Sequence, residues 1–250
     1  MFARFAELLN KYNNVSREYH RDVVSLFELN PEAKLLDLGC SDGEFTMKVA
    51  GKIGTSNIYG IEAIKEDVEQ AKAKGINCYQ GNLDGTKFPF EDNSFDVICA
   101  NQVMEHLTNT DNFIKEIHRV LKQGGYAVIS TPNLAAWHSI AFLLLGWQPY
   151  MADASEEFCW AGRPRMAISE REESQDHSQL HHKRCFVLKS LSDLFQYHGF
   201  SVEKKAASGF IPLPPRLARL ACAIDKRHAV IITLKARKNH LKKASCRASV

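Results

Sequence analysis

The chain has 250 residues, of which 45% are hydrophobic and 24% charged, the composition of a folded protein with a sizeable core. Six of its 32 basic residues lie in the acid-free stretch 235–250, and removing them leaves 26 basic against 29 acidic residues, a net charge of −3. The body of the chain is therefore not a nucleic-acid-binding surface by charge, and we expect no nucleic acid partner. We interpret the basic end as a disordered, solvated tail.

Cysteine usage and hydropathy indicate the compartment. The seven cysteines form no C-x-x-C pair and are odd in number, which favours a reduced, cytoplasmic protein. Cys78 and Cys99 fall in apolar strands and are expected to be small core residues. No signal peptide is expected, and the longest apolar segment, residues 140–147, is too short to span a bilayer.

The first 30 residues are predicted to form one or two helices that stop at Asn30-Pro31. An apolar face made by Tyr19, Val23, Val24, Leu26 and Phe27 is expected to pack on a sheet. The alternative is a helix that caps a ligand pocket, with Tyr12 or Tyr19 reaching into it.

Residues 35–43, Leu-Leu-Asp-Leu-Gly-Cys-Ser-Asp-Gly, are the most informative segment. They predict a strand that ends at Asp37 and a glycine-containing loop that leads into a helix over 44–50. Glycine lets the backbone turn sharply and approach a ligand, and the carboxyl ends of parallel strands bind ligands. A dinucleotide fingerprint is excluded because Ser41 occupies its second glycine position and Glu44 would repel a pyrophosphate at the helix start. An NAD-dependent oxidoreductase is therefore disfavoured.

The downstream chain alternates strands and helices over some 100 residues, which predicts βαβ units and a parallel sheet. The second strand, residues 57–62, ends in Glu62, whose carboxylate suits a ribose diol. The further expected elements are a helix over 65–74, strands over 77–80 and 97–100, a helix over 111–121 and a strand over 126–131.

Four segments, in order and spacing, resemble the class I S-adenosylmethionine-dependent methyltransferases, of the broad group that includes the ubiquinone and menaquinone biosynthesis methylases. They are Leu-Asp-Leu-Gly-Cys-Ser-Asp-Gly (36–43), Gly-Ile-Glu (60–62), Phe-Pro-Phe-Glu-Asp-Asn-Ser-Phe-Asp (88–96) and Glu-Ile-His-Arg-Val-Leu-Lys-Gln-Gly-Gly (116–125). The resemblance implies an α/β fold, with a doubly wound, mostly parallel, seven-stranded sheet of the Rossmann-like methyltransferase type. Its last strand, residues 230–234, would be antiparallel.

The same resemblance implies S-adenosylmethionine as cofactor and a set of residues around it. The methionine part would be surrounded by the first loop, namely Asp37, Gly39, Cys40, Ser41 and Gly43. The ribose hydroxyls would be held by Glu62, and the adenine would meet Ala63, Asn82, Leu83 and Asp84. The methyl side would be lined by Asn101 and Gln102. Ser41 stands where the family usually has glycine. Asn82 stands where the family usually has Asp, so we expect Asp84 to make the contact with the adenine amine instead.

Residues 133–184 are predicted to be a substrate lid inserted in a methyltransferase domain over 31–236, between an N-terminal cap over 1–30 and a basic tail over 237–250. The lid begins apolar, over 134–147, and becomes polar over 152–179. An apolar lid favours an acceptor with an aromatic or lipid portion, or a membrane interface. Its bulky residues are expected either in the core or in a pocket wall: Trp137, Phe142, Leu143 and Trp147.

His106 and His182 are the candidate catalytic residues, as a base or for positioning the acceptor, with a structural role as the alternative for both. His182 begins a segment that resembles a His-x-Arg-x-Phe element common in this family, and we expect this element to dock the lid or contact the substrate. No metal is expected, because no spacing supports Glu105 with Asp153 or Glu156 as ligands.

The sequence thus predicts a methyltransferase acting on a small-molecule acceptor, lipid-linked or of quinone type. The alternative is a catalytically silent S-adenosylmethionine-binding protein that acts as a regulator or partner. Peripheral contact of the protein with a membrane is a further alternative.

Overall fold

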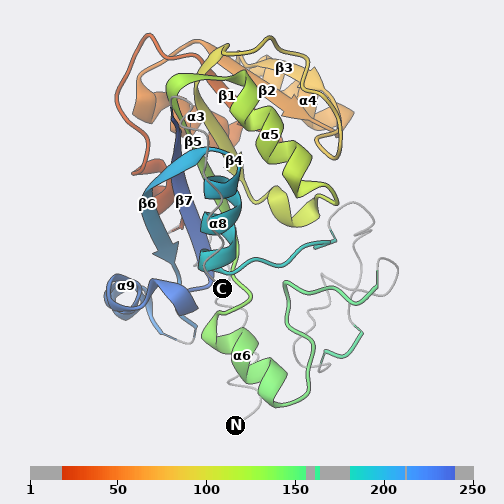
Figure 1. The fold of residues 1–250 in the computed structure, drawn as a ribbon, viewed down its shortest axis with the longest axis vertical. Coiled ribbons are helices and arrows are strands. Elements are labelled where there is room, and N and C mark those ends of the chain that lie inside the picture. The colour runs from red at the N-terminus through yellow and green to blue at the C-terminus, as the bar shows by residue number, and fades with distance from the viewer. Residues whose placement is uncertain (1–18, 156–160, 164–180, 212, 240–250) are drawn as a thin grey trace.

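The computed structural model describes residues 19–155, 161–163, 181–211 and 213–239. Within them one seven-stranded sheet has the order β3-β2-β1-β4-β5-β7-β6, with helices on both faces (Figure 1). Strands β1 to β5 are parallel, and β7 is antiparallel to both of its neighbours. The predicted fold class and the antiparallel last strand are confirmed. The strands are β1 (Leu35–Leu38), β2 (Ile58–Glu62), β3 (Asn77–Gln80), β4 (Phe95–Asn101), β5 (Leu121–Pro132), β6 (Phe200–Ser208) and β7 (Ile231–Lys238).

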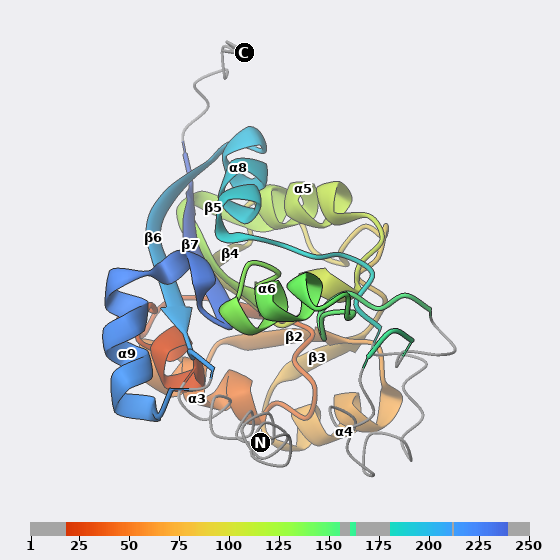
Figure 2. The same cartoon turned by 90° about the horizontal axis from the view of Figure 1, so that it is seen from below.

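Helices cover the sheet in two layers (Figure 2). Helices α3 and α4, with the helical residues 19–24, bury one apolar face, and α5 and α8 bury the other. The helical elements are α3 (Glu44–Ile53), α4 (Lys65–Ala73), η1 (Met104–His106), α5 (Thr110–Val120), α6 (Trp137–Leu144), α8 (Leu188–Tyr197), α9 (Pro215–Ile224) and η3 (Lys226–His228). None of the helices that the structure describes is long and apolar enough to cross a membrane.

Helix α5 shows how local sequence sets an element. Asn109 caps it, since its side chain accepts a hydrogen bond from the Asn112 amide at 3.0 Å. The helix then places apolar residues on one face at helical spacing, and all of them are fully buried: Phe113, Ile114, Ile117 and Val120. Burial of a side chain of this kind contributes roughly 1.5–3 kcal/mol, so packing fixes the helix against the sheet.

The N-terminal apolar face packs on the sheet as expected. Val23, Leu26 and Phe27 are buried in the same cluster as Val49 of α3 and Val97 of β4. Residues 1–18, including Tyr12, lie outside the described part of the chain. The cysteine expectation is also confirmed, because Cys78 and Cys99 are buried with free thiols.

The basic end of the chain differs from the prediction. Strand β7 continues to Lys238, past the expected domain boundary at 236. Lys235 is 1% exposed, pairs with Glu28 and lies 4.1 Å from the ring centre of Tyr126. Lys238 donates to the Leu121 carbonyl at 2.7 Å. A solvated tail from residue 235 is therefore wrong for these residues, because sheet pairing places their charges against acids and carbonyls.

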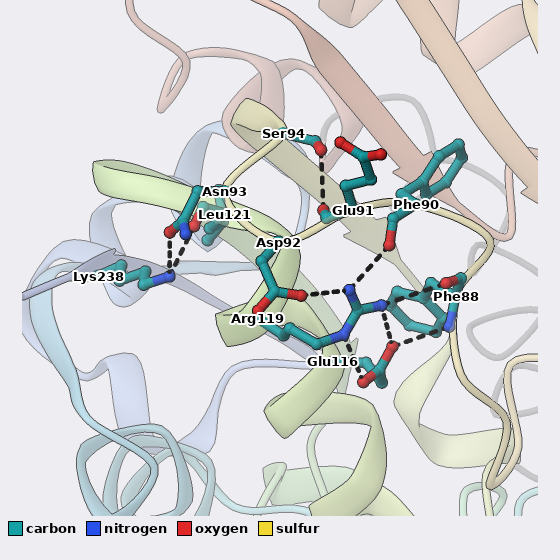
Figure 3. A network of polar contacts seen from close by, with 10 residues as sticks. All are labelled: Phe88, Phe90, Glu91, Asp92, Asn93, Ser94, Glu116, Arg119, Leu121 and Lys238. Atoms are coloured by element: carbon teal, nitrogen blue, oxygen red, sulfur yellow. Dashed lines mark hydrogen bonds and ion pairs between the residues drawn. The ribbon is translucent and has the colours of Figure 1, made fainter.

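Two of the four family-like motifs meet in one ionic network (Figure 3). The Arg119 guanidinium, from α5, donates to both oxygens of Glu116, at 2.9 and 2.6 Å, and to Asp92 at 2.9 Å. It also donates to the carbonyls of Phe88 and Phe90 at 3.1 and 2.8 Å. Glu116 in turn accepts the Phe88 amide at 2.8 Å. These motifs thus hold the loop over 88–96 against α5.

We predict that Arg119→Ala lowers the free energy of unfolding by about 2 kcal/mol or more, between the values for exposed and buried ion pairs, because Glu116 and two carbonyls lose their donor. Lys48→Ala is the control, since its pair with Glu44 is exposed and should contribute little to stability. Urea unfolding measures both. Equal effects of the two substitutions would contradict a structural role for the network.

Candidate active site

The loop between β1 and α3 has a left-handed backbone at three positions. Gly39 and Gly43 have φ angles of 72° and 83°, and a Cβ on Gly43 would lie 2.5 Å from Ile76 Cδ1. Ser41 has φ 46° although it is not glycine, a conformation that costs an ordinary residue roughly 1–2 kcal/mol. Ser41 therefore keeps the turn that glycine would make. Its hydroxyl donates to Asp67 at 3.2 Å.

Glu62 connects this loop to the end of β2. Its Oε2 accepts the Ser41 amide at 2.9 Å, and its Oε1 accepts the Ala63 amide at 2.7 Å. Ala63 is exposed and Glu62 half-buried, so the carboxylate stands at the open carboxyl edge of the sheet. A fixed negative charge there suits hydroxyl groups or a cation and opposes a phosphate.

Asp37 lies beneath the loop rather than at its surface. The alternation of β1 turns its side chain toward α3, where Thr46 Oγ1 donates to the carboxylate at 2.6 Å. Burial, opposed by this hydrogen bond, raises the pKa of Asp37 to about 7. Its contact with the methionine part of a cofactor stays a prediction.

The residues after β3 divide between core and surface. Leu83 is buried in the main apolar cluster, and Asn82 is exposed. Asp84 accepts the amides of Thr108 and Asn109 at 2.9 and 2.8 Å, so it holds the start of α5. Both carboxylate oxygens of Asp84 therefore already accept a backbone amide. A predicted hydrogen bond to adenine would have to be made by the same oxygens.

Strand β4 ends at Asn101. The side chains of Asn101 and of Gln102, the next residue, form a series of hydrogen bonds. Gln102 has φ 58°, and its side chain donates to Ser130 Oγ at 3.2 Å. Ser130 donates to Asn101 Oδ1 at 2.5 Å, and Asn101 donates to the Tyr19 hydroxyl at 3.4 Å. Strained positions of this kind cluster at functional sites. The N-terminal segment thus reaches the predicted methyl side through Tyr19.

His106 and His182 are brought together by residues 181–186, which return along η1. The amides of Lys183 and Arg184 donate to the Glu105 carbonyl at 2.7 and 3.0 Å, and the two histidine rings lie 5.0 Å apart. Burial lowers the pKa of both rings, that of His182 to about 4. Such a ring is a weak base near neutral pH, which disfavours the general-base interpretation.

The His-x-Arg-x-Phe element docks the returning chain. Arg184 donates to the Thr108 carbonyl at 2.6 Å, and Phe186 is buried in the core. A pocket of about 470 Å³ opens beside it, lined by Thr108, Asp153, Ala154, Ser155, His181, His182, Lys183 and Arg184. Among these lining residues, sequence reasoning singled out His182 and Arg184 through the His-x-Arg-x-Phe element, because the others carry no motif of their own.

The bulky lid residues split between core and surface. Phe142 is 1% exposed and packs against Trp147, with ring centres 5.7 Å apart. Trp137 is 49% exposed and stacks on His228 at 4.4 Å. Leu143 is exposed, as are its neighbours Leu144 and Leu145. Core packing is therefore correct for Phe142, while Trp137 and Leu143 face outward.

The sequence is similar to those of known methyltransferases. The model of the family described as "Methyltransferase domain" matches residues 36–129. A demethylmenaquinone methyltransferase of Staphylococcus epidermidis is 26% identical over 177 residues, 64% of this chain and 73% of that protein. A ubiquinone biosynthesis O-methyltransferase of Rickettsia akari is 31% identical over 152 residues, 57% of this chain and 60% of that protein.

The fold agrees with these similarities. The structure of an S-adenosylmethionine-dependent methyltransferase from Mesorhizobium loti matches with a TM-score of 0.59 at 19% identity, over 87% of this chain and 96% of that one. The matched domain, the relatives and the fold together support a class I S-adenosylmethionine-dependent methyltransferase. The cofactor of this methyltransferase is S-adenosylmethionine. The catalytically silent alternative loses support, because the matching relatives are methyltransferases.

The buried carboxylate of the methyltransferase gives a pH test. The pKa of Asp37 is raised from 3.8 to about 7, so the folded state binds its proton more tightly than the unfolded state. Its contribution to stability is present below about pH 4 and is lost as the pH rises to about 7.

We predict that Asp37→Asn gains stability relative to the wild type as the pH rises from 4 to 7, by up to about 4 kcal/mol for a shift of about three units. Asparagine keeps an acceptor for Thr46 but carries no charge. Urea unfolding of both proteins without cofactor, in half-unit pH steps, measures the difference. A pH-independent difference would show that Asp37 does not titrate in this window.

Proposed function

We propose that this enzyme methylates an amphipathic small molecule, with a polar ring and an apolar tail, of the quinone-precursor type. The observation that carries the proposal is the combination of a pocket lined mainly by polar residues with an exposed apolar helix in the insertion. The pocket is lined by hydroxyl, imidazole and charged groups such as Thr108, Asp153 and Lys183. Helix α6 exposes Leu144 and its apolar neighbours.

Packing contacts and hydrogen bonds link α6 to the returning chain beside the pocket. Residues after α6 fold back on it, with the Phe142 and Tyr150 rings 5.9 Å apart and Ser139 Oγ donating to Met151 Sδ at 2.9 Å. The Met151 carbonyl accepts the Cys185 thiol at 2.9 Å, which ties this segment to the returning chain. We infer that a ring bound in the pocket extends its tail toward the apolar surface of α6. The names of the relatives, methyltransferases of menaquinone and ubiquinone biosynthesis, support this acceptor class.

The residues at the carboxyl edge fit S-adenosylmethionine. Glu62 would accept the ribose hydroxyls, Ala63 and Asn82 would border the adenine, and the loop from Gly39 to Gly43 would follow the methionine part. The bound cofactor supplies a methyl group activated by a sulfonium. The chain supplies alignment, because holding the acceptor in line at contact distance lowers the barrier without a covalent step.

The acceptor class is tested with labelled S-adenosylmethionine and two kinds of acceptor, short-chain demethylmenaquinone and demethylated ubiquinone precursors. Each acceptor is compared with the same head group lacking the tail. We expect label transfer to a tailed compound, at a KM roughly tenfold or more below that of the bare head group, because a few buried CH₂ groups at about 0.8 kcal/mol each exceed 1.4 kcal/mol. Product analysis identifies the methylated atom. Transfer to small amines alone, with the cofactor bound normally, would overturn the acceptor class.

The cofactor site is tested through Glu62. We predict that S-adenosylmethionine binds in the micromolar range, about −8 kcal/mol, and that Glu62→Ala weakens binding by roughly tenfold or more, since charge-assisted hydrogen bonds contribute about 1.5–3 kcal/mol. Glu66→Ala, on the exposed surface of α4, is the control. Calorimetry measures all three proteins. Unchanged affinity of Glu62→Ala, or tighter binding of NAD, would refute the assignment.

A further inference from the structure

Beside the pocket, three side chains gather around one point. Glu105 and His106 are adjacent in η1, and His182 comes from the returning chain. One potential ligand atom from each lies within 4.8 Å of the others. The sequence separates His182 from the other two by more than 70 residues, and the hydrogen bonds from Lys183 and Arg184 to the Glu105 carbonyl help to bring it there.

Two atoms of this cluster are buried without a hydrogen-bond partner. Glu105 is 2% exposed, and its Oε1 has no partner, while its Oε2 accepts the Thr131 hydroxyl at 3.0 Å. His182 Nδ1 is likewise buried and unpartnered. An unsatisfied buried polar atom costs about 1–3 kcal/mol and calls for an explanation such as an ion. The two atoms do not bond to each other.

The outer contacts orient the three groups toward that point. His106 Nδ1 lies 3.0 Å from the His181 carbonyl oxygen, and since a carbonyl only accepts, Nδ1 carries the proton and Nε2 keeps its lone pair. The His182 ring is bonded on its other side to the backbone of Tyr150. Thr131 fixes the Glu105 carboxylate. Metal-binding histidines and carboxylates are held by outer hydrogen bonds of this kind.

We propose that Glu105, His106 and His182 bind a divalent transition-metal ion, with Zn²⁺ as the reference ion. Two imidazoles and one carboxylate match the ligand sets of catalytic zinc sites, which use three protein ligands and leave a position open. Imidazole ligands favour such ions over Mg²⁺ and Ca²⁺, which prefer oxygen.

His182 also lines the pocket, so an ion held by it would present its open position to a bound molecule. This step rests on the proposed function: an acceptor oxygen would coordinate there, which lowers the pKa of a hydroxyl and aligns the ring. Metal binding itself does not depend on the identity of the acceptor.

The test uses the full chain without a polyhistidine tag, stripped with a chelator and titrated with Zn²⁺ against a chromophoric competitor. Co²⁺ titration, followed by visible absorption, reports the ligand geometry. We expect one ion per chain. Glu105→Gln and His182→Ala should each weaken binding by roughly 100-fold or more, and Thr131→Val by roughly 10- to 100-fold, because removing a ligand costs at least as much as removing an outer partner.

His228→Ala is the matched control. Its imidazole lies 2.7 Å from Asp225, a histidine and carboxylate pair outside the proposed site, so its removal should leave the affinity unchanged. Circular dichroism checks that each variant is folded.

A wild-type protein that takes up neither Zn²⁺ nor Co²⁺ stoichiometrically would overturn the proposal without any variant. Equal affinity in the wild type and in a folded His182→Ala protein would do so as well. Calorimetry with S-adenosylmethionine on the same samples separates the two hypotheses. Failure to bind metal with normal cofactor binding leaves the methyltransferase assignment intact.

Discussion

The parallel pairing of β1 with β2 and β4 is the constraint on which the rest of the structure depends. Parallel strands require crossover connections, so the loops that follow β1, β2, β3 and β4 all emerge at one edge of the sheet. This brings Ser41 and Glu62 into hydrogen-bond contact although they are 21 residues apart. A site built from several short segments follows directly from the topology.

Acidic side chains at this edge accept hydrogen bonds from backbone amides of the protein itself. Glu62 holds the first loop, and Asp84 holds the start of α5. Such bonds pre-organise the loops, which reduces the entropy lost when a ligand binds. The strained backbone of Ser41 is held by Glu62, and that of Gln102 by Ser130.

The family-like motifs therefore serve two purposes. The segments around 36–43 and 60–62 form the carboxyl edge, where the cofactor is expected. The segments around 88–96 and 116–125 are joined through Arg119 on a separate part of the fold (Figure 3). A motif matched to a family is thus evidence for the fold as much as for the site. In the function proposed above, the acceptor side depends instead on the insertion after β5, whose returning chain is hydrogen-bonded to η1.

Much of the architecture could be predicted from the sequence, because the spacing of apolar residues and the residues that form turns are local features of the chain. Strand β3 was located at its observed limits, and the helices from α3 to α5 within a few residues. Seven strands were expected, but the sixth was not located. Strand β6 lies at the sheet edge and carries Glu203, Lys204 and Lys205, so it lacks the apolar run that marks a buried strand.

The sequence by itself determined the fold class, the family and the loop chemistry that favours an adenosyl ligand over a pyrophosphate, because these depend on residues close together in the chain. Tertiary structure alone decided that Asp37 is buried against Thr46, that Lys235 lies inside the sheet, and that Glu105, His106 and His182 converge. Each of these depends on contacts between distant segments. Such contacts are set by burial and sheet pairing, which no local pattern records.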